Sequence, residues 1–113
     1  MRHQESQLQQ NMVFWFRYAY PKYTLYAIPN GGARSKTEGA IMKGEGVLSG
    51  VADMFLMHAA QGYHGLYIEV KTPKGRQTDS QKAFEKEAFS AGYKYVIVRS
   101  VEEFMKIANE YLK

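Results

Sequence analysis

The sequence contains no cysteine and no apolar run of the roughly 20 residues that a membrane span requires. The missing cysteines exclude a disulfide scaffold and a cysteine-based zinc site. The first ten residues, MRHQESQLQQ, lack the apolar core of a signal peptide. We therefore expect a soluble protein in the cytoplasm, with no membrane partner.

Positive charge is only slightly in excess, with 15 Lys and Arg against 11 Asp and Glu and a formal net charge of +4. This excess is compatible with a polyanionic partner such as a nucleic acid, but it does not identify one. The 113 residues are 45% hydrophobic and 23% charged, as in globular chains. We expect a single domain over residues 1–113.

Hydrophobic periodicity and turn residues predict eight elements along the chain. We expect helices at 4–19, 35–44 and 78–91, a last helix opening after Ser100, and strands at 23–28, 53–58, 65–71 and 93–98. The first helix has an apolar stripe of Leu8, Met12, Trp15, Phe16 and Ala19, and it ends before Pro21. The order α-β-α-β-β-α-β-α predicts an α/β fold with a mixed β-sheet flanked by helices.

The residues that carry chemistry lie on the two neighbouring strands of a predicted hairpin. Glu69 and Lys71 share one face of their strand because side chains alternate, and Val70 points to the opposite face. A hairpin centred near Gln61 brings Asp53 beside Glu69. A shift of one residue in the pairing would turn Asp53 to the other face, so this register is a specific prediction.

Two neighbouring carboxylates repel each other unless a cation lies between them. Carboxylate and carbonyl oxygens suit Mg²⁺ or Mn²⁺, and the backbone carbonyl of Val70 is a plausible further ligand to Asp53 and Glu69. Such a metal can activate a water molecule and polarise a phosphodiester, while Lys71 stabilises developing negative charge. The alternative is an ordinary surface ion-pair cluster, which predicts no metal binding.

Two further residues have both a structural and a functional interpretation. Glu5 falls on the apolar stripe of the first helix, where an acid is unexpected, although it could also be a surface residue near the chain end. Gln81 could complete the catalytic site, or it could only close a capping box with Thr78. Ser100 and Glu103 predict a second capping box.

Several segments together resemble one nuclease family. These segments are PNGGARS (29–35), KGEGVLSGVAD (43–53), YIEVK (67–71) and SQ (80–81), preceded by Glu5. In this order they resemble the VRR-NUC family of the PD-(D/E)XK nuclease superfamily, in its standalone bacterial or phage type. The resemblance implies a restriction-endonuclease-like fold in which Asp53 and Glu69 hold the metal. It also implies that Lys71 is the catalytic lysine and that Glu5 and Gln81 complete the site.

The same resemblance implies an endonuclease that cuts branched DNA, including four-way (Holliday) junctions, as a homodimer in a bacterial or phage-infected cell. Two departures affect this expectation: Ala52 stands where the family usually has proline, and Ser100 stands where it has a second arginine. Arg99 is kept as a candidate phosphate contact. The other candidate DNA contacts are Asn30, Gly31, Arg34, Lys36, Lys43, Lys74 and Arg76, of which Asn30 and Gly31 could also form a plain turn.

Three alternatives stay open at this point. The chain could be a nucleic-acid-binding module of the same fold that does not cut, or a nuclease that acts on RNA. It could also be an interaction protein with a surface charge cluster.

Overall fold

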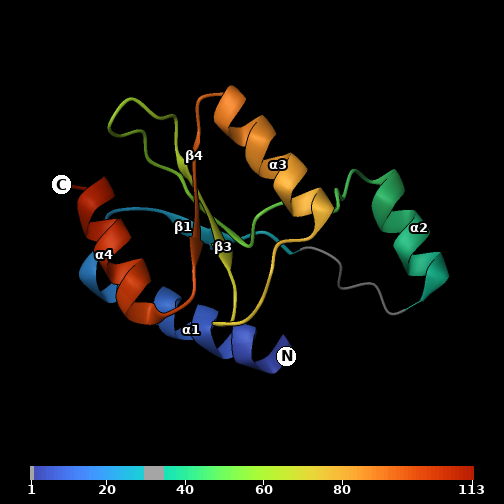
Figure 1. The fold of residues 1–113 in the computed structure, drawn as a ribbon, viewed down its shortest axis with the longest axis horizontal. Helices are drawn as coiled ribbons and strands as arrows, with labels where there is room; N and C mark the ends of the chain where they lie inside the picture. Colours follow the sequence, from blue (N-terminus) through green and yellow to red (C-terminus); the bar gives the residue numbers. More distant parts are fainter. Residues whose placement is uncertain (1, 30–34) are drawn as a thin grey trace.

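The computed structural model describes residues 2–29 and 35–113, and its elements follow the predicted order (Figure 1). The helices are α1 (Arg2–Ala19), α2 (Lys36–Gly44), α3 (Asp79–Ser90) and α4 (Val101–Tyr111). The strands are β1 (Leu25–Ala27), β2 (Met54–Leu56), β3 (Leu66–Val70) and β4 (Lys94–Val98).

The strands form one mixed sheet in the order β1-β2-β3-β4. The β1–β2 and β2–β3 pairs are antiparallel, and β3 and β4 are parallel. β1 is shorter than the predicted 23–28, but backbone pairing continues beyond it. Met57 N donates to Thr24 O (2.9 Å), and Ile28 N donates to Asp53 O (2.8 Å). The α/β class and the mixed sheet are therefore as predicted.

Helices cover both faces of this sheet, with α1 and α4 on one side and α3 on the other (Figure 1). The main core lies between the sheet and the α1–α4 pair. Its buried members are Met12, Phe16, Leu25, Met54, Leu56, Leu66, Ile68, Val70, Val98, Phe104, Ala108 and Tyr111. On the opposite face the ring of Tyr67 meets Phe84 of α3 at a centroid distance of 5.0 Å. The alternation predicted for β3 is thus present.

The apolar stripe of α1 differs from the prediction at its end. Met12 and Phe16 are fully buried, whereas Ala19 is exposed. The next residue, Tyr20, takes the expected place, since its ring packs 5.3 Å from Phe16 and 5.9 Å from Trp15. The helix ends at Ala19 and Pro21 follows, so the chain turns and brings the larger Tyr20 side chain to the core.

The second predicted capping box is only half formed. Ser100 is the N-cap of α4, and its hydroxyl accepts a hydrogen bond from Glu103 N (3.1 Å). The Glu103 carboxylate, however, accepts from Arg99 N (2.7 Å) and not from the cap residue itself. The helix therefore begins where predicted. The Glu103 side chain, however, bonds the amide of the residue before the cap and not the amide of the cap itself.

α2 differs from the other helices in its packing. It begins after the N-cap Ser35, whose hydroxyl accepts from Glu38 N, but none of its residues is buried. In Figure 1 it projects away from the sheet beyond α3. None of the helices in the described ranges combines the length and apolar character needed to cross a bilayer.

Candidate active site

The register of the central hairpin brings Asp53 to Glu69, as predicted. Met54 pairs with Ile68, so the residue before β2 faces Glu69. Asp53 Oδ2 accepts a hydrogen bond of 2.7 Å from Val70 N. Backbone pairing and the hydrogen bond of its own carboxylate therefore hold Asp53 against the end of β3.

The turn of this hairpin explains why the register is well defined. Gln61 and Gly62 both have positive φ, of 54° and 86°. They lie between Ala60 and Tyr63, which form an isolated bridge. Positive φ at both central residues is the conformation that two-residue hairpin turns of type I′ require. The hairpin is thus centred at Gln61, as expected.

The glycine-rich segment before Asp53 lies against the first turn of α3. Gly50 has a φ of +92°, and a Cβ added to it would come within 2.4 Å of Ser80 O. Ser49 and Ser80 hydroxyls lie 3.4 Å apart. Only glycine meets both the backbone and the space requirement here. The close approach places the chain that leads into Asp53 beside the start of α3.

Glu69 and Lys71 are two ionisable residues inside the protein. Their exposed fractions are 2% and 7%. Lys71 Nζ lies 3.7 Å from Glu69 Oε2, while Val70 between them belongs to the core on the other face. Burying charges is unfavourable unless each is compensated, so this pair needs further partners.

Gln81 supplies one of these partners and also caps its helix. Its Nε2 donates to Glu69 Oε2 (2.9 Å), and its Oε1 accepts from Thr78 N (2.9 Å). Thr78 Oγ1 in turn accepts from Gln81 N, which completes the capping box. Gln81 can therefore cap its helix and contact Glu69 at the same time. The amide oxygen does the first and the amide nitrogen does the second.

Glu69 is left with an uncompensated oxygen. Among the described residues, Glu69 Oε1 is buried without a hydrogen-bond partner. Burial, followed by the negative charge of Asp53, raises the pKa of Glu69 from its ordinary value of 4.5 to about 8, while Lys71 opposes the shift. A bound cation would remove both causes, since it replaces the lost solvation and neutralises the repulsion.

The donor set near Glu69 fits a hard divalent cation. In the described part of the chain, no group of three or more His, Cys, Asp or Glu side chains is close enough to hold a metal. Two carboxylates, Asp53 and Glu69, with the Val70 carbonyl leave coordination positions for water or phosphate oxygens. Mg²⁺ in particular keeps several waters and is commonly held by one or two carboxylates.

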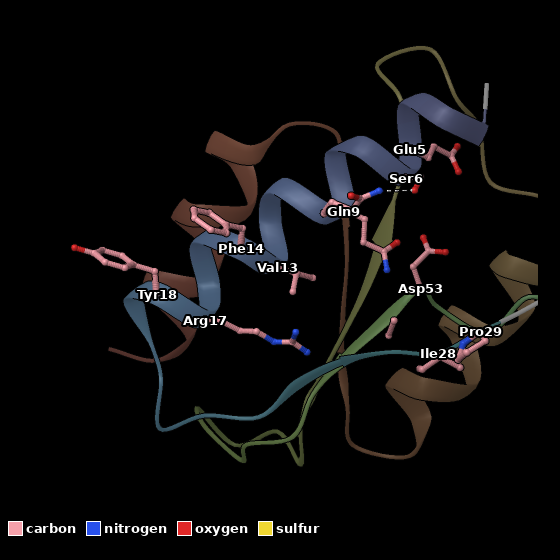
Figure 2. Close-up of a pocket in the computed structure, with 12 residues that line it drawn as sticks. Glu5, Ser6, Gln9, Val13, Phe14, Arg17, Tyr18, Ile28, Pro29 and Asp53 are labelled. Carbon is pink, nitrogen blue, oxygen red and sulfur yellow. Dashed lines mark hydrogen bonds between the residues drawn. The ribbon is translucent and has the colours of Figure 1, made fainter.

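Glu5 reaches the same region from α1. It is half-buried, and its charge adds to the causes that raise the pKa of Glu69. With Asp53 it lies at one end of a cavity of about 750 Å³ between α1 and β1 (Figure 2). The other lining residues are Ser6, Gln9, Gln10, Val13, Phe14, Arg17, Tyr18, Ala27, Ile28 and Pro29. The acid on the stripe thus faces the groove and not the core.

The predicted DNA contacts are spread over two surfaces. Lys36 and Lys43 are exposed on α2, and Lys74 and Arg76 are exposed on the loop after β3. The structure does not bring these pairs into contact with the carboxylates. Asn30, Gly31 and Arg34, which are also predicted to contact DNA, lie outside the described residues.

Arg99 has a structural function that the sequence did not indicate. Its Nη1 donates to Thr72 O (2.9 Å) and to Gly75 O (2.6 Å), so the half-buried guanidinium holds the loop that follows Lys71. A phosphate contact by Arg99 stays a prediction. The loop it holds carries Lys74, one of the candidate DNA contacts.

The histidines take no part in the candidate site. His58 packs edge-on against the Tyr23 ring at 4.6 Å, and the exposed His64 packs against Tyr93 at 5.6 Å. What the sequence reasoning missed is the groove that extends from Glu5 along α1. The spacing of four between Glu5 and the next groove residue, Gln9, was a signal that could have indicated it.

Comparisons with known proteins agree with this fold. The family model described as VRR-NUC domain matches residues 1–102. The structure of a "VRR_NUC domain protein" superposes with a TM-score of 0.79 at 23% sequence identity, covering 96% of this chain and 87% of that chain. At this identity the likeness shows the fold alone. No curated protein matches.

Proposed function

This chain belongs to the VRR-NUC family of nuclease domains, and from that premise we propose that it is a metal-dependent DNA endonuclease that hydrolyses phosphodiester bonds. The observation that carries the proposal is the buried Glu69, with one unpartnered oxygen, beside Asp53 and 3.7 Å from Lys71. Such an arrangement is costly for stability alone, and it gains a function when a cation and a phosphate bind.

Each residue of the site has a role in this proposal. Asp53, Glu69 and the Val70 carbonyl hold Mg²⁺ or Mn²⁺, which when bound supplies Lewis acidity and lowers the pKa of a water molecule. Lys71 places a positive charge where negative charge develops on the phosphate and orients the attacking water. Gln81 fixes the rotamer of Glu69 through its 2.9 Å hydrogen bond.

Glu5 completes the proposed centre from α1. Its half-buried carboxylate lies with that of Asp53 at one end of the groove (Figure 2). We assign it to the orientation of water around the metal rather than to the primary donor set. This position accounts for an acid on an otherwise apolar helix face.

Cleavage assays test the chemistry directly. Purified protein is incubated with a labelled four-way junction, a linear duplex, a single strand and a matched RNA, each with Mg²⁺, Mn²⁺ or EDTA. We expect cleavage of DNA that requires the metal and is lost in Asp53→Ala and Lys71→Ala, with folding unchanged. The exposed residues Glu87 and Lys82 on α3 provide matched controls, and their alanine variants should cut normally.

Other outcomes identify the alternatives. Binding without cleavage under every condition would favour a non-cutting nucleic-acid-binding module. Preferential cleavage of the RNA would make the protein a ribonuclease with the same centre. Near-normal rates in Asp53→Ala or Lys71→Ala would overturn the assignment of the centre itself.

We further propose that the substrate is branched DNA and that the protein cuts it as a homodimer. Two centres related by a two-fold axis suit symmetric cleavage of a four-way junction. Support comes from α2, which buries none of its residues and leaves Ile41 55% exposed, and from Leu48, which is 59% exposed just after it. Such apolar side chains gain by burial against a second copy.

The molar mass in solution, measured by light scattering, tests the dimer. We expect a mass of two chains for the wild type and of one chain for the double variant Ile41→Glu and Leu48→Glu. Phe89 on α3 is 69% exposed, and Phe89→Glu is the matched control that should keep the dimer. A wild-type protein that is monomeric and still cuts both strands of a junction symmetrically would contradict the proposal.

A further inference from the structure

The cavity beside the candidate centre continues along one face of α1. Residues four apart on a helix lie one above the other, so Glu5, Gln9, Val13 and Arg17 form one row facing the groove. A second row forms its rim: Ser6, Gln10, Phe14 and Tyr18. Figure 2 shows the carboxylates of Glu5 and Asp53 at one end of the groove and Arg17, Phe14 and Tyr18 at the other.

The far end of the groove presents two large aromatic rings to solvent. Phe14 is 79% exposed and Tyr18 is 83% exposed, and they are neighbours in the same row of α1. In the described structure neither has a ring–ring contact of the kind that holds Trp15 and Phe16 in the core. Exposed aromatic rings beside a groove are the usual means by which proteins stack unpaired bases.

Arg17 lies at the same end and adds a positive charge. Among the described residues, its guanidinium makes one hydrogen bond, from Nη2 to Leu25 O at 3.3 Å. A guanidinium has five N–H donors, so most of them are free to bind phosphate. The groove therefore has a cation and stacking surfaces at one end and metal-binding carboxylates at the other.

The dimensions of the groove suit a nucleotide chain. Twelve residues separate Glu5 from Arg17, which corresponds to about 18 Å along a helix. That length matches about five nucleotides stacked at roughly 3.4 Å each, and fewer when the strand is extended. A cavity of about 750 Å³ lies within the range of sites that enclose a small organic ligand, and so has room for individual bases.

We propose that this groove binds a single-stranded segment of the DNA substrate, with bases stacked on Phe14 and Tyr18 and a phosphate on Arg17. The segment leads to the scissile phosphate at Asp53. A base pair in a duplex hides its faces in the stack, so only an unpaired strand can use these rings. The inference rests on the proposed nuclease function and adds to its branched substrates those with a single-stranded segment next to the cleaved bond, since a fully paired four-way junction offers no unpaired strand to these rings.

Binding measurements in EDTA test the groove without cleavage. Fluorescence anisotropy is recorded with a labelled single strand and with a duplex of the same length. Phe14→Ala and Tyr18→Ala should each weaken single-strand binding by at least about fivefold, with duplex binding changed less than about twofold. Phe14→Trp should keep the wild-type affinity, because it restores a stacking surface.

A control and a salt series separate stacking from general effects. Phe89→Ala removes another largely exposed helix aromatic, which lies outside the groove, and should leave both affinities unchanged. Arg17→Gln should weaken single-strand binding and reduce the slope of log K against log salt by about 0.7, the value for one phosphate contact on a single strand. The fluorescence of 2-aminopurine placed in the single strand should fall on binding to the wild type and fall less with Phe14→Ala.

The outcomes distinguish the groove from the nuclease. Wild-type single-strand affinity in both Phe14→Ala and Tyr18→Ala overturns the groove proposal, even if metal-dependent cleavage is present. An equal loss in Phe89→Ala overturns it as well. Selective loss of single-strand binding in a protein that never cuts supports the groove and removes the nuclease proposal instead.

Discussion

At the scale of single residues, the chemistry depends on the environment of Glu69. Its carboxylate is 2% exposed, accepts from Gln81 through Oε2, and leaves Oε1 without a partner among the described residues. Burial and the charge of Asp53 raise the pKa of Glu69 to about 8. In the absence of metal this shift favours the protonated form of Glu69 near neutral pH, and a cation bound at the proposed centre would have to displace that proton.

The raised pKa of Glu69 predicts a stability that falls with rising pH in the absence of metal. Between pH 4.5 and about 8 the folded state binds a proton that the unfolded state has released. The free energy of unfolding is therefore highest below pH 4.5 with respect to this group, and it falls as the pH rises through 8. Urea titrations in EDTA at several pH values measure this. The side chain in Glu69→Gln has the same shape but cannot ionise, so the free energy of unfolding of this variant should fall less with rising pH. An equally steep fall in the variant would refute the assignment of this pH dependence to Glu69.

At the scale of elements, the first turn of α3 organises the site. Thr78 caps the helix, and Gln81 hydrogen-bonds both to Thr78 and to Glu69. The backbone of Ser80 packs closely against Gly50, in the segment that precedes Asp53. One turn of helix thus positions both carboxylates relative to each other. A change in this turn is expected to affect stability and activity separately, depending on which of these contacts it removes.

Two substitutions in α3 should separate these roles. Thr78→Ala removes the cap and should lower the free energy of unfolding by about 1 kcal/mol. Gln81→Glu keeps an oxygen for Thr78 N but replaces the donor to Glu69 with a second negative charge. We expect this variant to keep its cap and to lose about 10- to 100-fold in cleavage rate, the usual effect of disturbing a residue that orients a metal ligand. Urea titration and single-turnover kinetics measure the two quantities. Full activity in Gln81→Glu would show that its bond to Glu69 serves only the fold.

At the scale of the whole molecule, four separate parts of the chain meet at one place. α1 supplies Glu5, and α3 supplies Gln81. Asp53 directly precedes β2, Glu69 belongs to β3, and Lys71 directly follows β3. A ligand that bridges these parts binds only the folded state. It should therefore stabilise the molecule as a whole.

Metal binding should raise the thermal midpoint of unfolding. A cation at 100 times its dissociation constant stabilises the folded state by about 2.7 kcal/mol. We expect the midpoint to rise with Mn²⁺ concentration in the wild type and in the surface control Lys82→Ala, and to stay nearly constant in Asp53→Ala and Glu69→Gln. Differential scanning fluorimetry measures this independently of cleavage. A rise of equal size in Asp53→Ala would place the metal elsewhere.

Much of the architecture was predictable because it depends on local patterns. The hairpin at Gln61, the alternation around Val70 and the cap at Thr78 follow from spacings within a few residues, and the structure confirms them. The exposure of Ala19 and the use of Arg99 to hold the loop after Lys71 were not predictable. Both depend on neighbours that are far away in the sequence.

The sequence by itself determined the order of the elements and the pairing of Asp53 with Glu69. Side-chain alternation and turn length define a hairpin register without reference to the rest of the chain. Only the tertiary structure decided how strongly Glu69 is buried and that a groove lined by Glu5 and Arg17 leads to it. Burial and groove shape are set by the packing of α1 and α3 around the sheet, and such contacts between distant segments leave no periodic pattern in the sequence.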